Sequence, residues 1–256
     1  MTDPNAGPAA PEPGLRERKK RRTRLHIADI ATGLFLERGF DQVTVADVAR
    51  AADVSVNTVF NYFKTKEELF FDRIEEVVEH AAAVFAARRP GESAAAAFRR
   101  AFHAGLDDDV IYSGVHPGAE RWAATVNASP ALVAFQREIG RRSEERLAAA
   151  LAEATGAGPG DITPRTVAAM IMAVQGGLTR HALDRRLAGA GTEDLLREMH
   201  AVADRAFDLL EHGIAGYPAT GEAAGPGKDP TDGDTGRDAV PDGAPDGAGG
   251  AARGPA

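Results

Sequence analysis

Two asparagines one helical turn apart, Asn57 and Asn61, carry side chains able to read the edge of a base pair. An amide group both donates and accepts hydrogen bonds, so it can pair bidentately with the major-groove edge of adenine, and apolar side chains can contact a thymine methyl group. Threonine and tyrosine hydroxyls and the Lys66 ammonium suit phosphate oxygens, which fix position on a duplex without reading its sequence. The candidates for DNA contact in this stretch are Thr44, Ser55, Val56, Asn57, Thr58, Phe60, Asn61, Tyr62 and Lys66.

Two short capped helices would position these side chains. Thr44 is suited to cap the first helix, in which Val48 and Ala49 face inward, and Ser55 is suited to cap the second. The turn at residues 52–54 is too short for antiparallel packing, so the helices must cross steeply. A steep crossing presents the second helix to a major groove, as a helix-turn-helix does. The alternative is an ordinary helical corner without a ligand.

The order of residues from Ile27 to Phe71 resembles the tetracycline-repressor (TetR) family of bacterial regulators. The resemblance is carried by Ala31, Leu34-Phe35, Gly39-Phe40, Thr44-Val-Ala-Asp-Val-Ala, Val54-Ser55, Asn-Thr-Val-Phe-Asn-Tyr-Phe63 and Lys66-Glu-Glu-Leu69. It implies an N-terminal helix-turn-helix in which the residues at phosphate-contacting positions are Thr44, Thr58, Tyr62 and Lys66. The residues that it places at base-facing positions are Val56, Asn57, Phe60 and Asn61.

Two positions depart from the family pattern. Asp53 stands where the family has a glycine in the turn between the two helices. Aspartate tolerates the left-handed backbone conformation better than most residues, so we expect little damage from this change. Phe60 stands where many members have tyrosine, so we expect a hydrogen bond to a base or phosphate to be missing there.

A run of basic residues from Arg16 to Arg24 precedes the expected first helix. Its residues Lys19, Lys20, Arg21 and Arg22 are predicted to follow phosphates or enter a minor groove, as basic arms do. The alternative is a solvated charge run at the start of a domain. Beside a helix-turn-helix we favour the arm, which should steepen the salt dependence of binding by roughly one unit per phosphate contact.

The charge is unevenly distributed along the 256 residues. The whole chain carries a net charge of -8, but residues 14–66 hold eleven Lys and Arg against six Asp and Glu, a balance of +5. The remaining residues hold 19 basic and 32 acidic side chains, a balance of -13. A positive head on an acidic body favours contact with DNA through one end of the molecule.

Several classes of protein lack their diagnostic residues here. The chain has no cysteine, which excludes a disulfide, a Cys-ligated zinc and a thiol nucleophile. No H-E-x-x-H pair, G-x-S-x-G elbow, phosphate loop or dinucleotide fingerprint occurs, so we expect neither an enzyme nor a cofactor. Asp107-Asp-Asp109 could attract a divalent cation, although a solvated helix end is the commoner explanation. A helical metal-dependent enzyme and a nucleoid-type protein without sequence preference stay as alternatives.

The pattern of the chain predicts an all-α fold of about nine helices, because no stretch alternates apolar and polar residues at period two. One long helix is expected over Thr65–Arg89, and later ones at Ser93–Leu106, Pro117–Asn127, Pro130–Thr155, Pro164–Leu187 and Thr192–Ile214. The predicted divisions are a disordered tail at 1–14, a helix-turn-helix domain at 15–66, a ligand-binding and dimerisation domain at 67–216 and a disordered tail at 217–256. Neither a membrane span nor a secretory signal is present, so we expect a cytoplasmic protein without a membrane partner.

The last two long helices carry apolar stripes suited to an interface between chains. The stripes are Leu195, Met199, Val202, Ala206 and Leu209 on one helix, and Val167, Met170, Ile171, Val174 and Leu178 on the other. Two such helices from each of two chains would form a four-helix bundle, giving a homodimer for a palindromic operator. The alternative is that both stripes pack within one chain.

Side chains in the body could line a chamber for a small, largely apolar effector. The candidates are Phe98, Phe102, His103, Arg121, Trp122, Val126, Phe135, Ile139, Met170 and Gln175, although each alone is commoner as plain core. His103 and Arg121 would anchor an acidic head group. The stretch Pro130–Leu187 is similar to family members associated with acyl-thioester-like ligands. The family default is a repressor whose effector favours a body conformation in which the Thr65–Arg89 helix swings two reading heads off half-site spacing.

Overall fold

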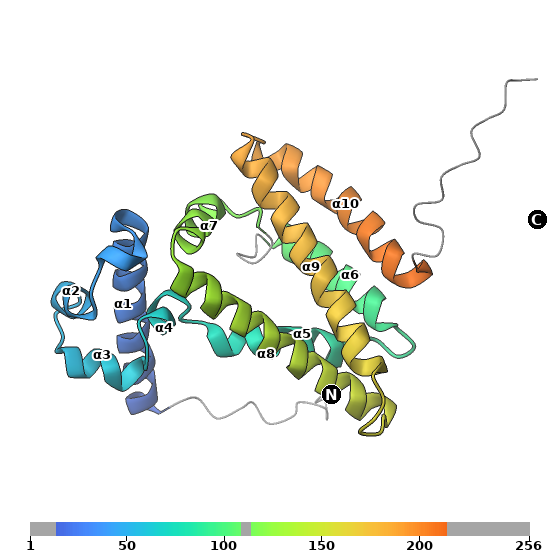
Figure 1. Cartoon of the computed structure of the whole chain (residues 1–256), viewed down its shortest axis with the longest axis horizontal. Coiled ribbons are helices and arrows are strands. Elements are labelled where there is room, and N and C mark those ends of the chain that lie inside the picture. The colour runs from blue at the N-terminus through green and yellow to red at the C-terminus, as the bar shows by residue number, and fades with distance from the viewer. Residues whose placement is uncertain (1–13, 109–113, 214–256) are drawn as a thin grey trace, which may run out of the picture. The chain divides into compact units, whose positions relative to one another are not determined.

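The computed structural model describes residues 14–108 and 114–213, and within these ranges it contains ten α-helices, one short 3-10 helix and no strand (Figure 1). The predicted all-α fold is confirmed. The two tails that the sequence predicts to be disordered, 1–14 and 217–256, lie outside the described residues apart from Gly14. None of the described helices is long and apolar enough to cross a membrane.

The first half of the described chain contains α1 (Leu15–Arg38), η1 (Phe40–Gln42), α2 (Val45–Ala51), α3 (Val56–Tyr62), α4 (Glu67–Phe70) and α5 (Ile74–Ala86). The second half contains α6 (Ala94–Asp107), α7 (Ala119–Asn127), α8 (Pro130–Thr155), α9 (Thr163–Leu187) and α10 (Thr192–His212). Local chemistry explains several ends. Gly39 stops α1 at a φ of +86°, and Pro130 occupies the first turn of α8, where its missing N–H has no intrahelical partner to lose.

The predicted single helix over Thr65–Arg89 is wrong, because the chain breaks at Phe71–Arg73 between α4 and α5. Phe70 is buried against Phe35 and Phe40, whereas Phe71 packs edge-on against Trp122 and stacks on Phe135. Consecutive side chains on an α-helix point about 100° apart, so the break lets two adjacent aromatic side chains both contact Trp122 while packing also on the separate neighbours Phe40 and Phe135. This break supplies the tenth helix.

Two main apolar cores stabilise the described part of the chain. The head core joins α1 to α4, and its largest fully buried side chains include Ile27, Phe35, Phe63 and Leu69. It also takes Val126 from α7 and Leu132 from α8, so these helices pack directly on the head. The body core joins α5, α6, α8, α9 and α10 around residues that include Phe98, Leu147, Ile171, Leu178, Met199 and Phe207.

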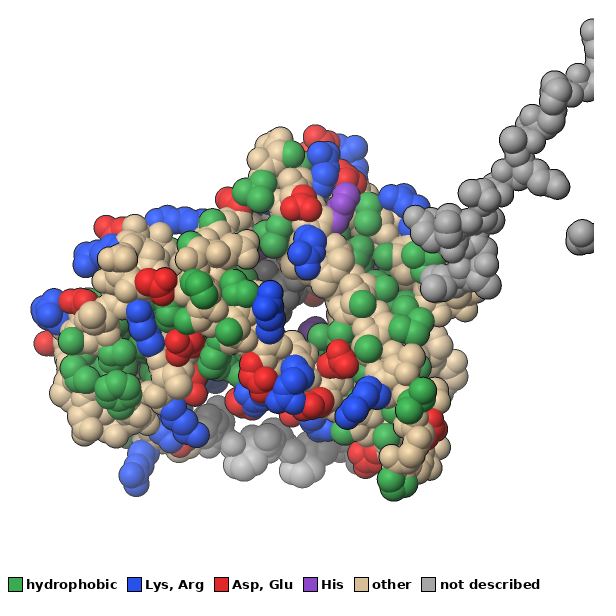
Figure 2. Space-filling model, viewed as in Figure 1, with side chains coloured by type: hydrophobic (Ala, Val, Ile, Leu, Met, Phe, Trp, Pro, Cys, Tyr) green, Lys and Arg blue, Asp and Glu red, His purple; other side chains and the backbone are tan. Residues whose placement is uncertain are grey.

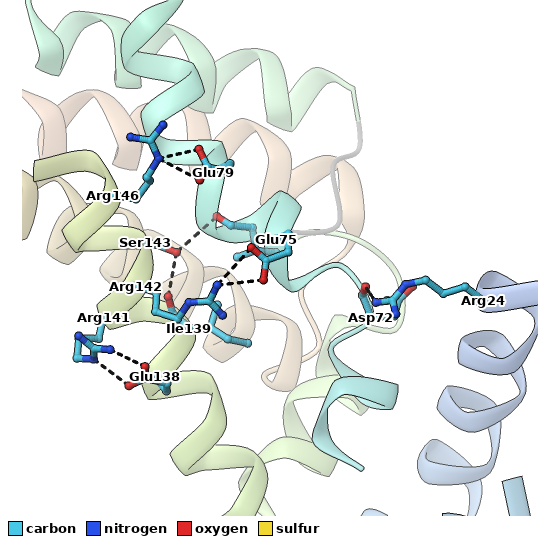
Figure 3. Close-up of polar contacts among 11 residues, drawn as sticks. Arg24, Asp72, Glu75, Glu79, Glu138, Ile139, Arg141, Arg142, Ser143 and Arg146 are labelled. Carbon is cyan, nitrogen blue, oxygen red and sulfur yellow. Dashed lines mark hydrogen bonds and ion pairs between the residues drawn. The ribbon is translucent and has the colours of Figure 1, made fainter. Parts of the chain in front are cut away.

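Helix α5 packs along α8 and is joined to it by two ion pairs, as Figure 3 shows. Arg142 on α8 reaches both carboxylate oxygens of Glu75 at 3.0 and 3.2 Å, and Arg146 reaches those of Glu79 at 2.8 and 3.0 Å. A small apolar cluster of Ile74, Val78 and Ile139 lies at the same interface. Exposed ion pairs contribute little each, so the apolar contact holds the helices together and the ion pairs fix how they align.

Candidate DNA-binding interface

Helix α2 begins with a reciprocal capping box. The Asp47 N–H donates to the Thr44 hydroxyl at 3.1 Å, and the Asp47 carboxylate accepts from the Thr44 N–H at 3.0 Å and from its hydroxyl at 2.6 Å. The hydroxyl of Thr44, its N–H and the Arg50 guanidinium, in that order of effect, lower the pKa of Asp47 to about 2. Two N–H groups that a helix start leaves open are thereby satisfied, which fixes where α2 begins.

The turn from α2 to α3 has a defined hydrogen-bond pattern. The Val54 N–H donates to the Ala49 carbonyl at 2.9 Å, and the Asp53 N–H donates to the Arg50 carbonyl at 3.3 Å. This pair of bonds is a Schellman motif, which needs a left-handed residue at its centre. Asp53 is that residue, with a φ of +53°. Aspartate thus takes the left-handed position at which the family has glycine, and the expectation that this change does little damage stays a prediction.

Helix α3 is short and presents its polar and apolar side chains outward. Ser55 caps it by accepting a hydrogen bond from the Thr58 N–H at 3.0 Å. Its buried contact with the head core is Val59, and Phe63 follows it into the same core. The outward residues Val56, Asn57, Phe60 and Asn61 are exposed, while Thr58 and Tyr62 are half-buried. Figure 2 shows hydrophobic side chains gathered on the surface over α3.

Lys66 is half-buried, and its side chain contacts η1. Its ammonium donates to the Phe40 carbonyl at 2.6 Å and lies 4.1 Å from the centre of the Phe40 ring. Burial lowers the pKa of Lys66, against the opposing effect of the nearby Asp41 and Glu67. Lys66 therefore joins the start of α4 to η1, whatever further donors it offers to DNA.

The prediction that the basic residues form an arm ahead of the first helix is wrong. They form the first turns of that helix, because α1 begins at Leu15. Lysine and arginine favour helix, and Glu17 lies one turn before Arg21, a pairing that stabilises helices. Lys19, Lys20, Arg21 and Arg22 are all exposed. A pocket of about 440 Å³ lies where this segment meets α3, and its lining residues are Glu17, Arg18, Lys20, Arg21, Arg24 and Tyr62.

Comparison with known proteins decides the family. The model for bacterial regulatory proteins of the tetR family matches residues 27–72. The HTH-type transcriptional regulator TcmR of Streptomyces glaucescens is 38% identical over 170 residues, which cover 63% of this chain and 74% of TcmR. The chain belongs to the TetR family.

Other relatives agree over shorter stretches or in fold alone. The HTH-type transcriptional regulator LuxR of Vibrio harveyi is 42% identical over 69 residues, or 24% of this chain and 32% of LuxR. A transcriptional regulator of Pseudomonas aeruginosa PAO1 shares the fold, with a TM-score of 0.52 and 16% identity over 76% of this chain and 93% of that one. This TetR-family protein is a DNA-binding transcriptional regulator, and its relatives support neither the nucleoid-type protein nor the metal-dependent enzyme.

The apolar effector candidates of this TetR-family protein are spread over three apolar clusters, two of which meet at Phe71. Trp122 and Val126 belong to the head core, where Trp122 stacks on Phe70 at a centroid distance of 5.5 Å. Phe98 and Phe102 belong to the body core. The small α5–α8 cluster contains Phe135 and Ile139.

The polar effector candidates are engaged elsewhere. Arg121 is exposed and donates to the Leu36 carbonyl of α1 at 3.2 Å. His103 faces His200 across α6 and α10, with 2.7 Å between their Nδ1 atoms, and its Nε2 lies 3.0 Å from Asp204. Gln175 is half-buried, and Met170 is 44% exposed.

Much of each predicted dimer stripe packs inside the chain. Leu195 and Met199 of α10 are fully buried in the body core, as Ile171 and Leu178 of α9 nearly are. Val167, Val174, Val202 and Ala206 pack against that core while partly buried. Met170 and Leu209 stay exposed, at 44% and 47%.

The described residues include one group able to chelate a metal ion, Asp208, Glu211 and His212 at the end of α10. All three are exposed, and Arg99 already pairs with both acidic members at 2.5 and 3.4 Å. The predicted acidic run at 107–109 is described only as far as Asp108, and Asp107 pairs with His200 at 3.3 Å. Neither group indicates a cofactor.

Arg24 was not among the predicted DNA-contacting residues, although its side chain contacts other segments of the head. It belongs to the basic run, but its side chain is half-buried and bonded to α3 and to the turn before α5. Its acceptors are backbone carbonyls, which no residue type reveals.

Proposed function

We propose that this protein is a homodimeric repressor that reads a palindromic operator with α3 and is released from it by a small, largely apolar ligand. Its partners would be double-stranded DNA, a second copy of the chain and that effector, and its compartment the cytoplasm. Residues on α3 would read bases, and residues at the starts of α1, α2 and α4 would contact phosphates.

The observation that carries this proposal is the exposure of apolar side chains on α3. Val56 and Phe60 are 40% and 49% exposed, although the helix is capped and anchored by Val59. Water contact with apolar surface is unfavourable, so these side chains gain free energy when another surface covers them. Thymine methyl groups in a major groove would provide such a surface, and Asn57 and Asn61 beside them would pair with adenine.

Phosphate contacts would hold α3 in the groove. Thr44, Ser55, Thr58 and Tyr62 carry hydroxyls at or near the ends of α2 and α3. The exposed basic residues Lys19, Lys20, Arg21 and Arg22 lie along the first turns of α1, which meets Tyr62 at the pocket described above. Such contacts position a protein on DNA and make its affinity depend on salt.

Dimerisation would supply the second reading head for a palindromic site. The exposed Met170 on α9 and Leu209 on α10 favour these helices as the surface between copies. The effector would bind in the body, where the surface is hollowed between α8 and α9 (Figure 2). Because α5 is fastened to α8, a change in the body would reach the head through α5 and α4.

The experiment is a selection of DNA fragments by the purified full-length protein at physiological salt. The proposal predicts an enriched palindrome whose half-sites are about one helical turn apart, bound by two chains, as sedimentation of the complex would show. No enrichment, with binding that disappears as salt rises, would leave only electrostatic attachment to DNA and contradict the proposal. An enriched site without two-fold symmetry would contradict the dimeric part of it.

A further inference from the structure

Arg24 differs from the exposed basic residues around it because the protein itself binds its guanidinium. One terminal nitrogen, Nη1, donates to the Tyr62 carbonyl at 2.7 Å, and Nη2 donates to the Asp72 carbonyl at 2.8 Å. The guanidinium carbon lies 4.2 Å from the centre of the Phe63 ring. Figure 3 shows the side chain extending from α1 toward Asp72. One side chain therefore joins α1, the carboxyl end of α3 and the turn before α5.

Both acceptors are carbonyls that lie at the edge of helices. Tyr62 is the last residue of α3, and the final carbonyls of an α-helix have no partner within the helix and carry the negative end of its dipole. Asp72 lies in the break between α4 and α5. A cation that donates to both carbonyls is favoured by charge as well as by geometry.

Arginine is specifically suited to this position. Its donors are held in a planar fork, so two acceptors from different segments can be served without strain. A lysine ammonium is a single nitrogen and serves two separated carbonyls less well. The face of the buried Phe63 ring fixes the guanidinium against the head core. The contact of Arg24 is therefore both directional and anchored.

The start of α5 is held in place by contacts with α8 in the body. Asp72 comes two residues before the first residue of α5, and α5 is aligned along α8 by Arg142–Glu75 and Arg146–Glu79. A displacement of α5 would move the Asp72 carbonyl, and Arg24 would carry that displacement to the end of α3.

We propose that Arg24 is a positioning residue of the DNA-reading head. It holds the carboxyl end of α3 in a fixed place relative to α5, and thereby sets how Asn57, Phe60 and Asn61 meet the base edges. It acts through α3, because one N–H of each terminal nitrogen is donated to a carbonyl of the head and the guanidinium is thereby directed at the protein. This inference rests on the proposed function, because it takes α3 as the helix that reads bases.

The test is to compare operator and random-sequence DNA binding by the wild type, Arg24→Met and Arg24→Lys. Methionine keeps apolar contact with Phe63 and removes both hydrogen bonds. We expect the dissociation constant for the operator to rise about ten-fold in Arg24→Met, from the loss of charged hydrogen bonds that orient α3. The constant for random DNA should change less than about two-fold, and the slope of log K against log salt should not change, because no phosphate contact is removed. Arg24→Lys keeps the charge but has a single donor nitrogen, so its discrimination should lie between the other two.

Arg38→Met is the matched control. It removes the same charge from the same helix, at an exposed end where Arg38 pairs with Glu37 at 3.8 Å, and should leave discrimination at the wild-type value. Thermal unfolding of each variant measures stability separately. A purely structural role would lower the fraction of active protein without changing the ratio of the two dissociation constants.

Two results would overturn the inference. An equal loss on operator and random DNA, with a salt slope shallower by about 0.9, would make Arg24 a phosphate contact. Wild-type discrimination in Arg24→Met would make it dispensable, and if that variant does not fold, Arg24→Lys decides by the same ratio. Failure of the wild type itself to discriminate would instead contradict the proposed function.

Discussion

The variant Phe60→Ala should weaken operator binding much more than it destabilises the head. The Phe60 side chain is 49% exposed on α3, so about 100 Å² of a phenylalanine's area of roughly 200 Å² meets water in the free protein. If the operator covers this area, about 25 cal/mol per Å² gives up to about 2.5 kcal/mol for each α3, or nearly two orders of magnitude in the dissociation constant. Because the other half of the Phe60 side chain packs on the head, its loss should lower the unfolding free energy of the variant by about 1 kcal/mol.

The assay is fluorescence anisotropy of a labelled operator titrated with Phe60→Ala, with urea unfolding measured on the same preparation. No charge is removed, so the salt slope should equal that of the wild type. Ile162→Ala, which truncates a side chain that is 75% exposed outside the head, is the control for losing apolar surface. Operator affinity within two-fold of the wild type, together with the expected loss of stability, would refute the base-facing role of Phe60.

Two further predictions concern the supports of α3. Thr44→Ala should lower the unfolding free energy by about 1 kcal/mol through loss of the α2 cap. In the wild type the pKa of Asp47 is lowered to about 2 from 3.8. The ionised Asp47 carboxylate therefore contributes fully to the unfolding free energy above about pH 4, and this contribution is lost as pH falls toward 2. Thr44→Ala should raise that pKa and weaken this acid dependence in urea unfolding, and an identical dependence in both proteins would contradict the capping argument. Because Asp53 has a φ of +53°, Asp53→Ala should lower the unfolding free energy by about 1 kcal/mol while Asp53→Gly should not, and equal losses in both variants would count against the turn geometry.

The features that the sequence predicted well depend on local chemistry. Thr44 and Ser55 cap their helices through bonds to residues three positions later, and Asp53 adopts the left-handed turn between them. Each depends on a side chain and its immediate neighbours. The order of residues in this stretch also indicates the family, and the all-α fold follows from membership of that family.

The features that the sequence missed depend on distant contacts. The pair Phe70 and Phe71 fits a helical pattern, yet the chain breaks there, where both rings contact Trp122 of α7 while Phe70 also packs on Phe40 and Phe71 on Phe135. In the sequence Arg24 is indistinguishable from the other residues of the basic run, because its acceptors are carbonyls 38 and 48 positions away. The basic run was expected to precede the first helix as an arm, although its residues have good helix propensity and form the start of α1.

The effector candidates show the same limit. Trp122, Phe98 and Phe135 are all large and apolar, but they fall into the head core, the body core and the small α5–α8 cluster respectively. Residue type predicts burial and does not predict which cluster a side chain joins. Their assignment to one chamber stays a prediction, as does the domain boundary after residue 66, beyond which Leu69 and Phe70 still belong to the head core.

The proposed reading of bases by α3 is tested by measuring base preference position by position for Asn61→Ala. The variant should lose preference at one position of each half-site by about 1–3 kcal/mol and keep it elsewhere, because a single bidentate contact is removed. Asn127→Ala, which truncates an exposed asparagine at the end of α7, should keep the wild-type profile. An Asn61→Ala profile identical to that of the wild type at every position would contradict the base-reading role of α3.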